Sequence, residues 1–272
     1  MPYLDTDDGG RVHYEHYSGR NIPIVLIHGW GMSTRVWYSM VEGLCRAGHE
    51  VVAIDQRGCG NSDRDFADVS IAANARDVQA IAAKLGLAPA ILNGWSLGGA
   101  IAAEAAALMG SAAAGLVLTC GATPRLTRAD DFPYGAEPGS YAGLGDALLT
   151  GRAAFFRGIA DGTCAKDVGQ PTRDWLQAIF MESGPMLYTS LAAAEDLDQR
   201  SLLAGLDIPV LAIVGGSDVI VSPDIGKQAA ACAKHGEIAL FPESGHAPFL
   251  EEPEAYLAEL LRFSAASQSA RA

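Results

Sequence analysis

Residues 91–100 read Ile-Leu-Asn-Gly-Trp-Ser-Leu-Gly-Gly-Ala: an apolar run, a Gly-x-Ser-x-Gly turn and the start of an alanine-rich segment. This order predicts a buried strand, a sharp turn with Ser96 at its apex, and a helix. Gly94 and Gly98 suit such a turn because they have no Cβ atom to crowd the backbone beside the serine. The stretch therefore predicts a serine hydroxyl lifted clear of a sheet at the N-terminus of a helix.

The composition is that of an acidic globular chain of 272 residues, with a net charge of −13 and 49% hydrophobic residues. We expect no nucleic-acid or membrane partner, because nucleic acid and anionic membranes call for surfaces rich in Lys and Arg. The five cysteines are odd in number and form no C-x-x-C pair, which favours a reducing compartment. The first residues lack the basic start and apolar run of a signal peptide. We therefore expect a cytoplasmic protein.

Apolar strand patterns alternate with helical patterns on both sides of the serine turn. Such strands are typical of a parallel sheet covered by helices on both faces. The segment 12–17 instead alternates in polarity and predicts an antiparallel strand at the edge of the sheet. The tail, 264–272, is expected to be frayed. The predicted buried strands are 22–27, 49–55, 91–95, 115–120, 208–214 and 237–241, and the predicted helices are 33–47, 70–85, 100–109, 224–235 and 253–263.

The alternation stops between residues 121 and 205, where turn-rich pieces and short amphipathic stretches replace strand patterns. We interpret this segment as a helical cap inserted into a core formed by 1–120 and 206–272. Large apolar side chains in and beside the cap are candidates for a substrate pocket. Those we expect in the pocket are Trp30, Phe155, Phe156, Met181 and Phe249.

An activated serine needs a base and a third group that orients the base. Asp218 and His246 each follow a predicted strand, and the carboxyl ends of parallel strands lie along one edge of a sheet, so we expect both to approach Ser96. His246 would take the serine proton while Asp218 fixes the imidazole tautomer. Asp77, Asp196 and Asp198 are alternative acids, although none follows a strand end.

Two backbone N–H groups are candidates for an oxyanion hole. That of Leu97 lies at the start of the helix behind Ser96, and that of Trp30 directly follows His28-Gly29 at another strand end. His28 itself is expected to be structural, hydrogen-bonded to nearby backbone, and Asp55 and Arg57 to brace their loop. Neither a metal nor a cofactor is expected.

Five motifs in this chain resemble those of the α/β-hydrolase superfamily, in the order of that family. They are H-G-x-x at His28, D-x-R-G-x-G-x-S over 55–62, the elbow at Ser96, G-x-x-D at Asp218 and G-H at His246. The resemblance covers most of the chain outside the cap, and the order Ser, Asp, His matches the family. It implies an α/β-hydrolase fold, with a mostly parallel central sheet, flanking helices and a small helical cap.

Residues 28–31, 94–99 and 246–249 are similar to those of pimeloyl-carrier-protein methyl ester esterases and related carboxylesterases. The similarity implies a serine hydrolase that cleaves a small to medium, mostly apolar carboxylic ester or lactone through an acyl-enzyme. An acidic carrier protein is a doubtful partner, because residues 121–200 hold 11 Asp and Glu against 7 Lys and Arg, whereas docking would call for a basic face.

Other reactions on the same fold remain alternatives. A perhydrolase or cofactor-free haloperoxidase shares the triad, but such enzymes often carry Pro directly after the oxyanion-hole Trp, where this chain has Gly31. A C–C bond hydrolase and a ligand receptor built on the hydrolase fold are the other candidates. Relatives with a nucleophilic Asp are disfavoured because position 96 is Ser.

Overall fold

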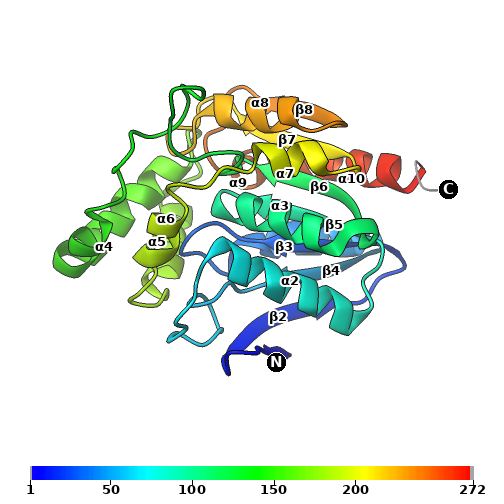
Figure 1. The fold of residues 1–272 in the computed structure, drawn as a ribbon, viewed down its shortest axis with the longest axis horizontal. Helices are drawn as coiled ribbons and strands as arrows, with labels where there is room; N and C mark the ends of the chain where they lie inside the picture. The colour runs from blue at the N-terminus through cyan, green and yellow to red at the C-terminus, as the bar shows by residue number, and fades with distance from the viewer. Residues whose placement is uncertain (1, 270–272) are drawn as a thin grey trace.

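The computed structural model describes residues 2–269, in which eight strands form one sheet in the order β1-β2-β4-β3-β5-β6-β7-β8 (Figure 1). The β1–β2 and β2–β4 pairs are antiparallel, and every other neighbouring pair is parallel. The strands are β1 (Tyr3–Asp5), β2 (Arg11–Tyr17), β3 (Asn21–Ile27), β4 (His49–Ile54), β5 (Ala90–Trp95), β6 (Ala113–Thr119), β7 (Val210–Gly215) and β8 (Gly236–Phe241).

Helices cover both faces of the sheet (Figure 1). On one face α2, α3, α7 and α8 contact one another in succession, and on the other α1 contacts α10, which contacts α9 and β6. These helices are α1 (Tyr38–Arg46, after a short 3-10 turn, Thr34–Trp37), α2 (Ile71–Leu85), α3 (Leu97–Met109, followed by a 3-10 turn, Gly110–Ala112), α7 (Arg200–Gly205), α8 (Pro223–Cys232), α9 (Pro248–Glu251) and α10 (Pro253–Ser269).

Residues 121–205, here called the cap segment, contribute helices but no strand to the described part of the chain. Three of its helices stand together beyond one end of the sheet (Figure 1). They are α4 (Leu144–Thr163), α5 (Gln170–Met181) and α6 (Tyr188–Ala193). The fourth, α7, packs on α3 and α8 instead, so the end of the cap segment already belongs to a helical layer of the sheet.

The parallel strands end side by side, which brings the loops that follow them together. In the sheet register Ile27 pairs with Gly94, Trp95 with Thr119 and Thr119 with Ile213. All residues of β5, β6 and β7 are buried, as expected for strands that lie between two layers of helices. The carboxyl edge of these strands therefore faces the cap segment.

Two expectations at the ends of the chain were wrong. The strand β2 is not at the edge of the sheet, because the three residues of β1 pair along its outer side. The tail is not frayed from residue 264, because α10 continues to Ser269 and buries Ser264 and Ser267; residues 270–272 lie outside the described residues. Among those described, no helix combines the length and the apolar character needed to span a membrane.

Gly98 gives a test of the packing beneath the serine turn. A Cβ atom there would meet the backbone carbonyl oxygens of Ile27 and His28, so we expect Gly98→Ala to lower the free energy of unfolding by roughly 1–3 kcal/mol. Gly205→Ala is the control because a Cβ atom there meets nothing within 4 Å. Urea unfolding of both variants checks this, and equal stability would contradict the close packing.

Candidate active site

Ser96 lies in a backbone conformation that few side chains adopt. Its φ is 56° and its ψ is −124°, and the hydrogen bonds of its own peptide groups hold it there: its N–H donates to the carbonyl of Thr119 and its carbonyl accepts from Gly99 and Ala122. A Cβ atom at Gly94 would collide with the carbonyl of Gly98. The glycines of the motif are therefore required by the turn, and the turn presents the Ser96 side chain above the end of β5.

The loop after β3 approaches the same serine. A Cβ atom at Gly29 would lie 3.1 Å from the Cβ of Ser96, so the chain passes close enough to place Trp30 beside it. Leu97 begins α3, and the N–H of a first helical residue has no acceptor within its helix. Among the described residues, neither this N–H nor that of Trp30 has a hydrogen-bond acceptor. Both predicted oxyanion donors are thus available next to Ser96.

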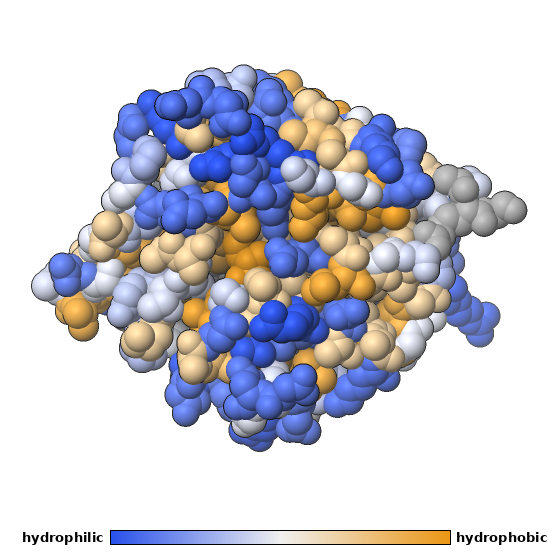
Figure 2. All heavy atoms as spheres, in the orientation of Figure 1, coloured by the Kyte–Doolittle hydropathy of each residue, from blue (hydrophilic) through white to orange (hydrophobic). Residues whose placement is uncertain are grey.

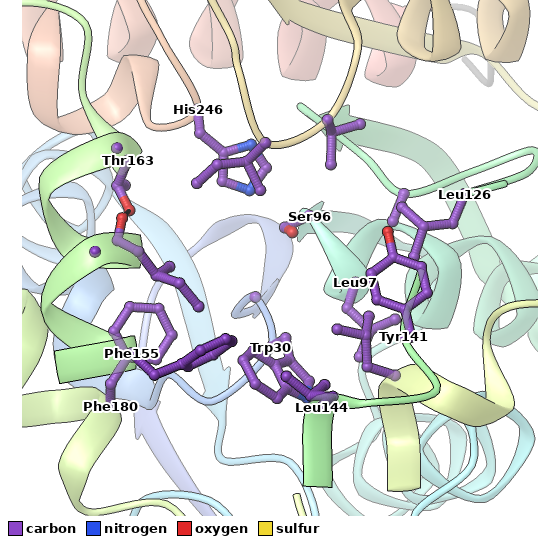
Figure 3. Close-up of a pocket in the computed structure, with 18 of the residues that line it drawn as sticks. Trp30, Ser96, Leu97, Leu126, Tyr141, Leu144, Phe155, Thr163, Phe180 and His246 are labelled. Atoms are coloured by element: carbon purple, nitrogen blue, oxygen red, sulfur yellow. Dashed lines mark hydrogen bonds between the residues drawn. The ribbon is translucent and has the colours of Figure 1, made fainter. Parts of the chain in front are cut away.

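Asp218 and His246 form a buried pair, with 2.7 Å between Asp218 Oδ2 and His246 Nδ1. The other carboxylate oxygen, Oδ1, accepts from the backbone N–H groups of Ile220 and Val221 at 2.8 and 3.0 Å. These bonds fix the acid and leave the Nε2 side of the imidazole available. In Figure 3 the ring of His246 and Ser96 lie on the same side of one cavity, and both line it.

The three alternative acids are either paired with an arginine or exposed at the surface. Asp77 forms a bidentate pair with Arg57, at 2.6 and 3.0 Å. Asp198 binds Arg200, at 2.6 Å, and Asp196 is exposed. Of the four acids, only Asp218 contacts His246.

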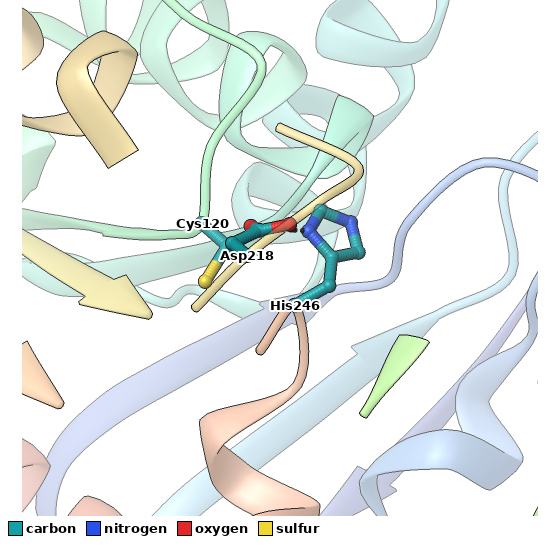
Figure 4. A group of neighbouring side chains, drawn as sticks. All are labelled: Cys120, Asp218 and His246. Carbon is teal, nitrogen blue, oxygen red and sulfur yellow. Dashed lines mark hydrogen bonds and ion pairs between the residues drawn. The ribbon is translucent and has the colours of Figure 1, made fainter. Parts of the chain in front are cut away.

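Cys120 is a neighbour of this pair that the sequence analysis missed (Figure 4). Its Sγ lies with one ligand atom each of Asp218 and His246 in a buried group whose atoms are all within 4.8 Å of one another. Burial, followed by the charge of Asp218, raises the pKa of the Cys120 thiol well above its usual range. The thiol is therefore protonated at neutral pH. A soft metal ion would have to displace this proton and part the Asp218–His246 hydrogen bond before it could bind here.

A cavity of about 820 Å³ lies between the core and the cap segment. Figure 2 shows apolar side chains gathered where these two parts meet. The walls of the cavity are formed by the ends of the parallel strands, helix α4, the loop before α4, and residues of α5 and α6 (Figure 3). Residues that line it include Trp30, Ser96, Leu97, Leu126, Tyr141, Leu144, Phe155, Ile159, Thr163, Phe180, Leu191, Val219 and His246.

Two of the five predicted pocket residues, Trp30 and Phe155, line this cavity, and the other three do not. Phe156 is fully buried behind it, stacked on Phe180 at 5.0 Å between ring centroids. Phe249 is fully buried in the core, 4.5 Å from Trp37 and 5.1 Å from Trp95 between ring centroids.

Met181 has 42% of its surface exposed and lies outside the cavity lining. At Phe156 and Met181 the cause is that helical spacing does not say which face of an amphipathic helix looks into the cavity and which packs inward. Phe249 instead lies in the short α9 after His246, and its ring packs into the core.

Tyr141 is a polar group in the cavity wall that the sequence analysis did not select. Its hydroxyl has no hydrogen-bond partner among the described residues, while the hydroxyls of Ser140 and Thr163 donate to backbone carbonyls. Burial, followed by the charge of Glu195, raises the pKa of Tyr141 to about 12. The phenol therefore keeps its proton at neutral pH and can donate a hydrogen bond to a bound molecule.

A sequence profile of the alpha/beta hydrolase family matches residues 24–260. The chain belongs to the alpha/beta hydrolase family. It is 33% identical to the pimeloyl-[acyl-carrier protein] methyl ester esterase of Stenotrophomonas maltophilia (strain R551-3), over 91% of this chain and 95% of that protein. It is 28% identical to a non-heme haloperoxidase of Rhodococcus erythropolis, over 97% and 99% of the two chains.

The fold agrees with this membership. The solved structure of an esterase from Exiguobacterium antarcticum superposes with a TM-score of 0.93 at 24% identity, over 97% of this chain and 98% of the esterase. The predicted fold class is confirmed, and the named relatives support a hydrolase related to esterases. At 24% identity, the likeness to that structure concerns the fold alone.

His28 of this hydrolase lies fully buried beside the proposed oxyanion donors. Its Nδ1 is 2.7 Å from the carbonyl of Gly29, and its Nε2 accepts from the backbone N–H of Gln56 at 3.0 Å. An imidazole that donates from one nitrogen and accepts at the other is neutral. Burial lowers the pKa of His28 accordingly. These bonds fit the structural part expected for His28.

Asp55 and Arg57 have the bracing contacts expected of them. Asp55 accepts from the N–H groups of Thr34 and Asn61 and from His13. Arg57 binds Asp77 and, through Nη1, Asp8 at 2.7 Å. Both side chains therefore hold the loop after β4 rather than reach the cavity.

The lowered pKa of His28 predicts a pH dependence of stability. Below about pH 6.5 the unfolded chain takes up a proton at this histidine and the folded chain does not, so folding stability falls with decreasing pH, by up to ~1.4 kcal/mol per pH unit for one group. We expect the free energy of unfolding of His28→Gln to change less between pH 7 and 5 than that of the wild type. His235→Gln, at an exposed position, should keep the pH dependence of the wild type. Urea titrations at several pH values measure this; equal slopes in all three proteins would contradict it.

Proposed function

We propose that this hydrolase is a serine esterase that cleaves a small to medium, mostly apolar carboxylic ester or lactone through an acyl-enzyme on Ser96. The observation that carries the proposal is the Asp218–His246 pair beside the cavity that Ser96 lines. A nucleophile, a base and an oriented acid are the three parts that acyl transfer by serine needs.

In the first half-reaction Ser96 Oγ attacks the acyl carbon and His246 Nε2 takes the hydroxyl proton. The negative charge that develops on the carbonyl oxygen is stabilised by the N–H groups of Trp30 and Leu97. The C–O bond to the alcohol then breaks, and His246 returns the proton to the departing oxygen. Asp218 stabilises the imidazolium through both steps.

In the second half-reaction water attacks the acyl-enzyme with His246 again as base, which releases the acid and restores Ser96. In a lactone the acid and alcohol are joined, so one product leaves after this step. Every transferred proton passes between groups of this chain and the reactants, so the proposed reaction needs no cofactor.

The cavity supports an apolar acyl or alcohol group. Its volume of about 820 Å³ lies within the usual range for small-molecule sites, roughly 300–1,000 Å³. Side chains such as Trp30, Leu144 and Phe155 form its walls. An acidic carrier protein is not part of this proposal, because acidic residues exceed basic ones in the cap segment.

A perhydrolase is the second candidate, favoured by the similarity to the non-heme haloperoxidase of Rhodococcus erythropolis. The same acyl-enzyme would then be attacked by hydrogen peroxide in place of water, giving a peracid. Gly31, where such enzymes often carry Pro, is the feature of this chain that weighs against it.

Substitution of the nucleophile gives the decisive test. We expect Ser96→Ala to lower kcat for p-nitrophenyl acyl esters by at least about 10³-fold, because removal of a triad member leaves only binding and the oxyanion hole. Ser140→Ala is the matched control: it removes a hydroxyl from the same cavity, but one that donates to the carbonyl of Glu137.

The outcomes separate the candidates. Many turnovers by the wild type and loss only in Ser96→Ala support the esterase, and peracid formed when hydrogen peroxide is added supports the perhydrolase. A single stoichiometric burst would indicate a ligand receptor on a hydrolase fold. If Ser96→Ala kept most of the activity, the proposed nucleophile would be wrong.

Phe155 tests the assignment of the cavity to the substrate. Truncation of this wall side chain removes apolar contacts to a bulky acyl group, so we expect Phe155→Ala to lower kcat/KM for octanoyl esters about tenfold, equal to ~1.4 kcal/mol, and to change acetyl esters little. Met181→Ala is the control, because Met181 lies outside the cavity lining. An acyl-chain series on both variants measures the effect, and equal losses for octanoyl and acetyl esters would argue against this cavity.

A further inference from the structure

The carboxylate of Glu251, at the end of α9, collects backbone N–H groups from two separate segments. Its Oε2 accepts from Ala165 and Lys166, each at 2.8 Å. The same carboxylate accepts from Gly245, at 2.9 and 3.0 Å, and more distantly from Ala247, at 3.3 Å. The first pair of donors follows helix α4 of the cap segment, and the second pair flanks His246.

The two segments touch directly at the same place. The N–H of His246 donates to the carbonyl of Thr163, the last residue of α4, at 2.8 Å. A Cβ atom at Gly245 would lie 2.7 Å from the nitrogen of Ala165. The backbone before the histidine is therefore pressed against the cap segment, with no room for a side chain between them.

A charged carboxylate suits four converging N–H groups because hydrogen bonds to an ionised acceptor are shorter and stronger than neutral ones. Glutamine at this position would keep the shape of the side chain but would direct an NH₂ group at N–H donors. The short helix α9 brings the Glu251 side chain to these N–H groups. The helix begins at Pro248, and one turn later the side chain of Glu251 lies back over Gly245 and Ala247.

His246 has no regular element to hold it. Its carbonyl accepts from the indole N–H of Trp95 at 2.7 Å, and its ring contacts Asp218. Without Glu251 the peptide groups on both sides of the histidine would lose their common acceptor, while the contacts of His246 to Trp95, Asp218 and the carbonyl of Thr163 would remain. The loop would then stay in place, but the peptide groups before and after His246 would move more freely about these remaining contacts.

We propose that Glu251 is a positioning residue, which holds His246 in its working orientation by tying the histidine loop to the end of α4. The proposal rests on the proposed function, since it assigns His246 the part of the base. In this proposal the cap segment supports the base in addition to forming a wall of the cavity.

Glu251→Gln tests the proposal, with Glu254→Gln as the matched control. Glu254 is exposed in the first turn of α10, so its substitution removes the same charge close by without touching the loop. We expect Glu251→Gln to lower kcat for p-nitrophenyl esters, per active site titrated, about 10²-fold, as a misplacement of about 1 Å does. KM should stay close to that of the wild type, because the cavity walls are unchanged.

Two further measurements do not depend on the choice of ester. The rate at which a fluorophosphonate probe labels Ser96 should fall by a similar factor in Glu251→Gln, with Ser96→Ala as the unlabelled reference. Hydrogen exchange should become faster at the amides of residues 165, 166, 245 and 247 together, and should not change in Glu254→Gln. If Glu251→Gln does not fold, Glu251→Asp replaces it, because aspartate keeps the charge but is too short to reach both segments.

The outcomes distinguish this proposal from the proposed function. A wild type that the probe does not label would refute the proposed function, and hydrogen exchange then decides alone whether Glu251 ties the two segments. The positioning role would be overturned if Glu251→Gln were labelled and turned over substrate at the same rates as Glu254→Gln. Unchanged exchange at the four amides would overturn the link to α4. A loss of thermal stability with full turnover per titrated site would mean that Glu251 is merely structural.

Discussion

The strained backbone at Ser96 is the constraint on which the rest of the site depends. A non-glycine residue held at φ 56° and ψ −124° costs of order 1–3 kcal/mol, and it persists only where its surroundings leave no alternative. Those surroundings are the hydrogen bonds of its peptide groups to Thr119, Gly99 and Ala122. Because these partners belong to β6, the loop after it and the first turn of α3, the side chain of Ser96 has one direction left, toward the cavity.

The proposed base is held in a different way. His246 lies in a loop, and its contacts come from the carbonyl of Thr163, the indole of Trp95 and the carboxylate of Asp218. Each partner comes from a distant part of the chain. The serine is thus oriented by the backbone conformation of its own turn, which β6 and α3 hold in place, whereas the histidine is oriented by separate contacts from three distant segments. Loss of one contact at the histidine leaves the others intact, so this half of the site can lose precision without loss of the fold.

This difference explains what the sequence could predict. The turn at Ser96, the strands and the pairing of Asp218 with His246 could be inferred because local spacing and parallel-sheet topology determine them. The roles of Cys120, Tyr141 and Glu251 could not be inferred from the sequence, because each depends on segments that meet only in the folded chain. The cap segment was predicted to be helical, but which faces of α4 and α5 line the cavity depends on packing. Phe155 and Phe156 are adjacent, and one lines the cavity while the other is buried behind it.

The cap segment contacts both sides of the proposed chemistry. Its Leu187 carbonyl accepts from the indole N–H of Trp30 at 3.1 Å, and its Thr163 carbonyl accepts from the N–H of His246. The segment that forms part of the cavity wall is therefore linked to a proposed oxyanion donor and to the proposed base. A change in the cap that admits a different acyl group can also shift these two groups. If the proposed function holds, substrate choice and reactivity are coupled through these two contacts, and a cap exchanged as a unit would need matching residues at both.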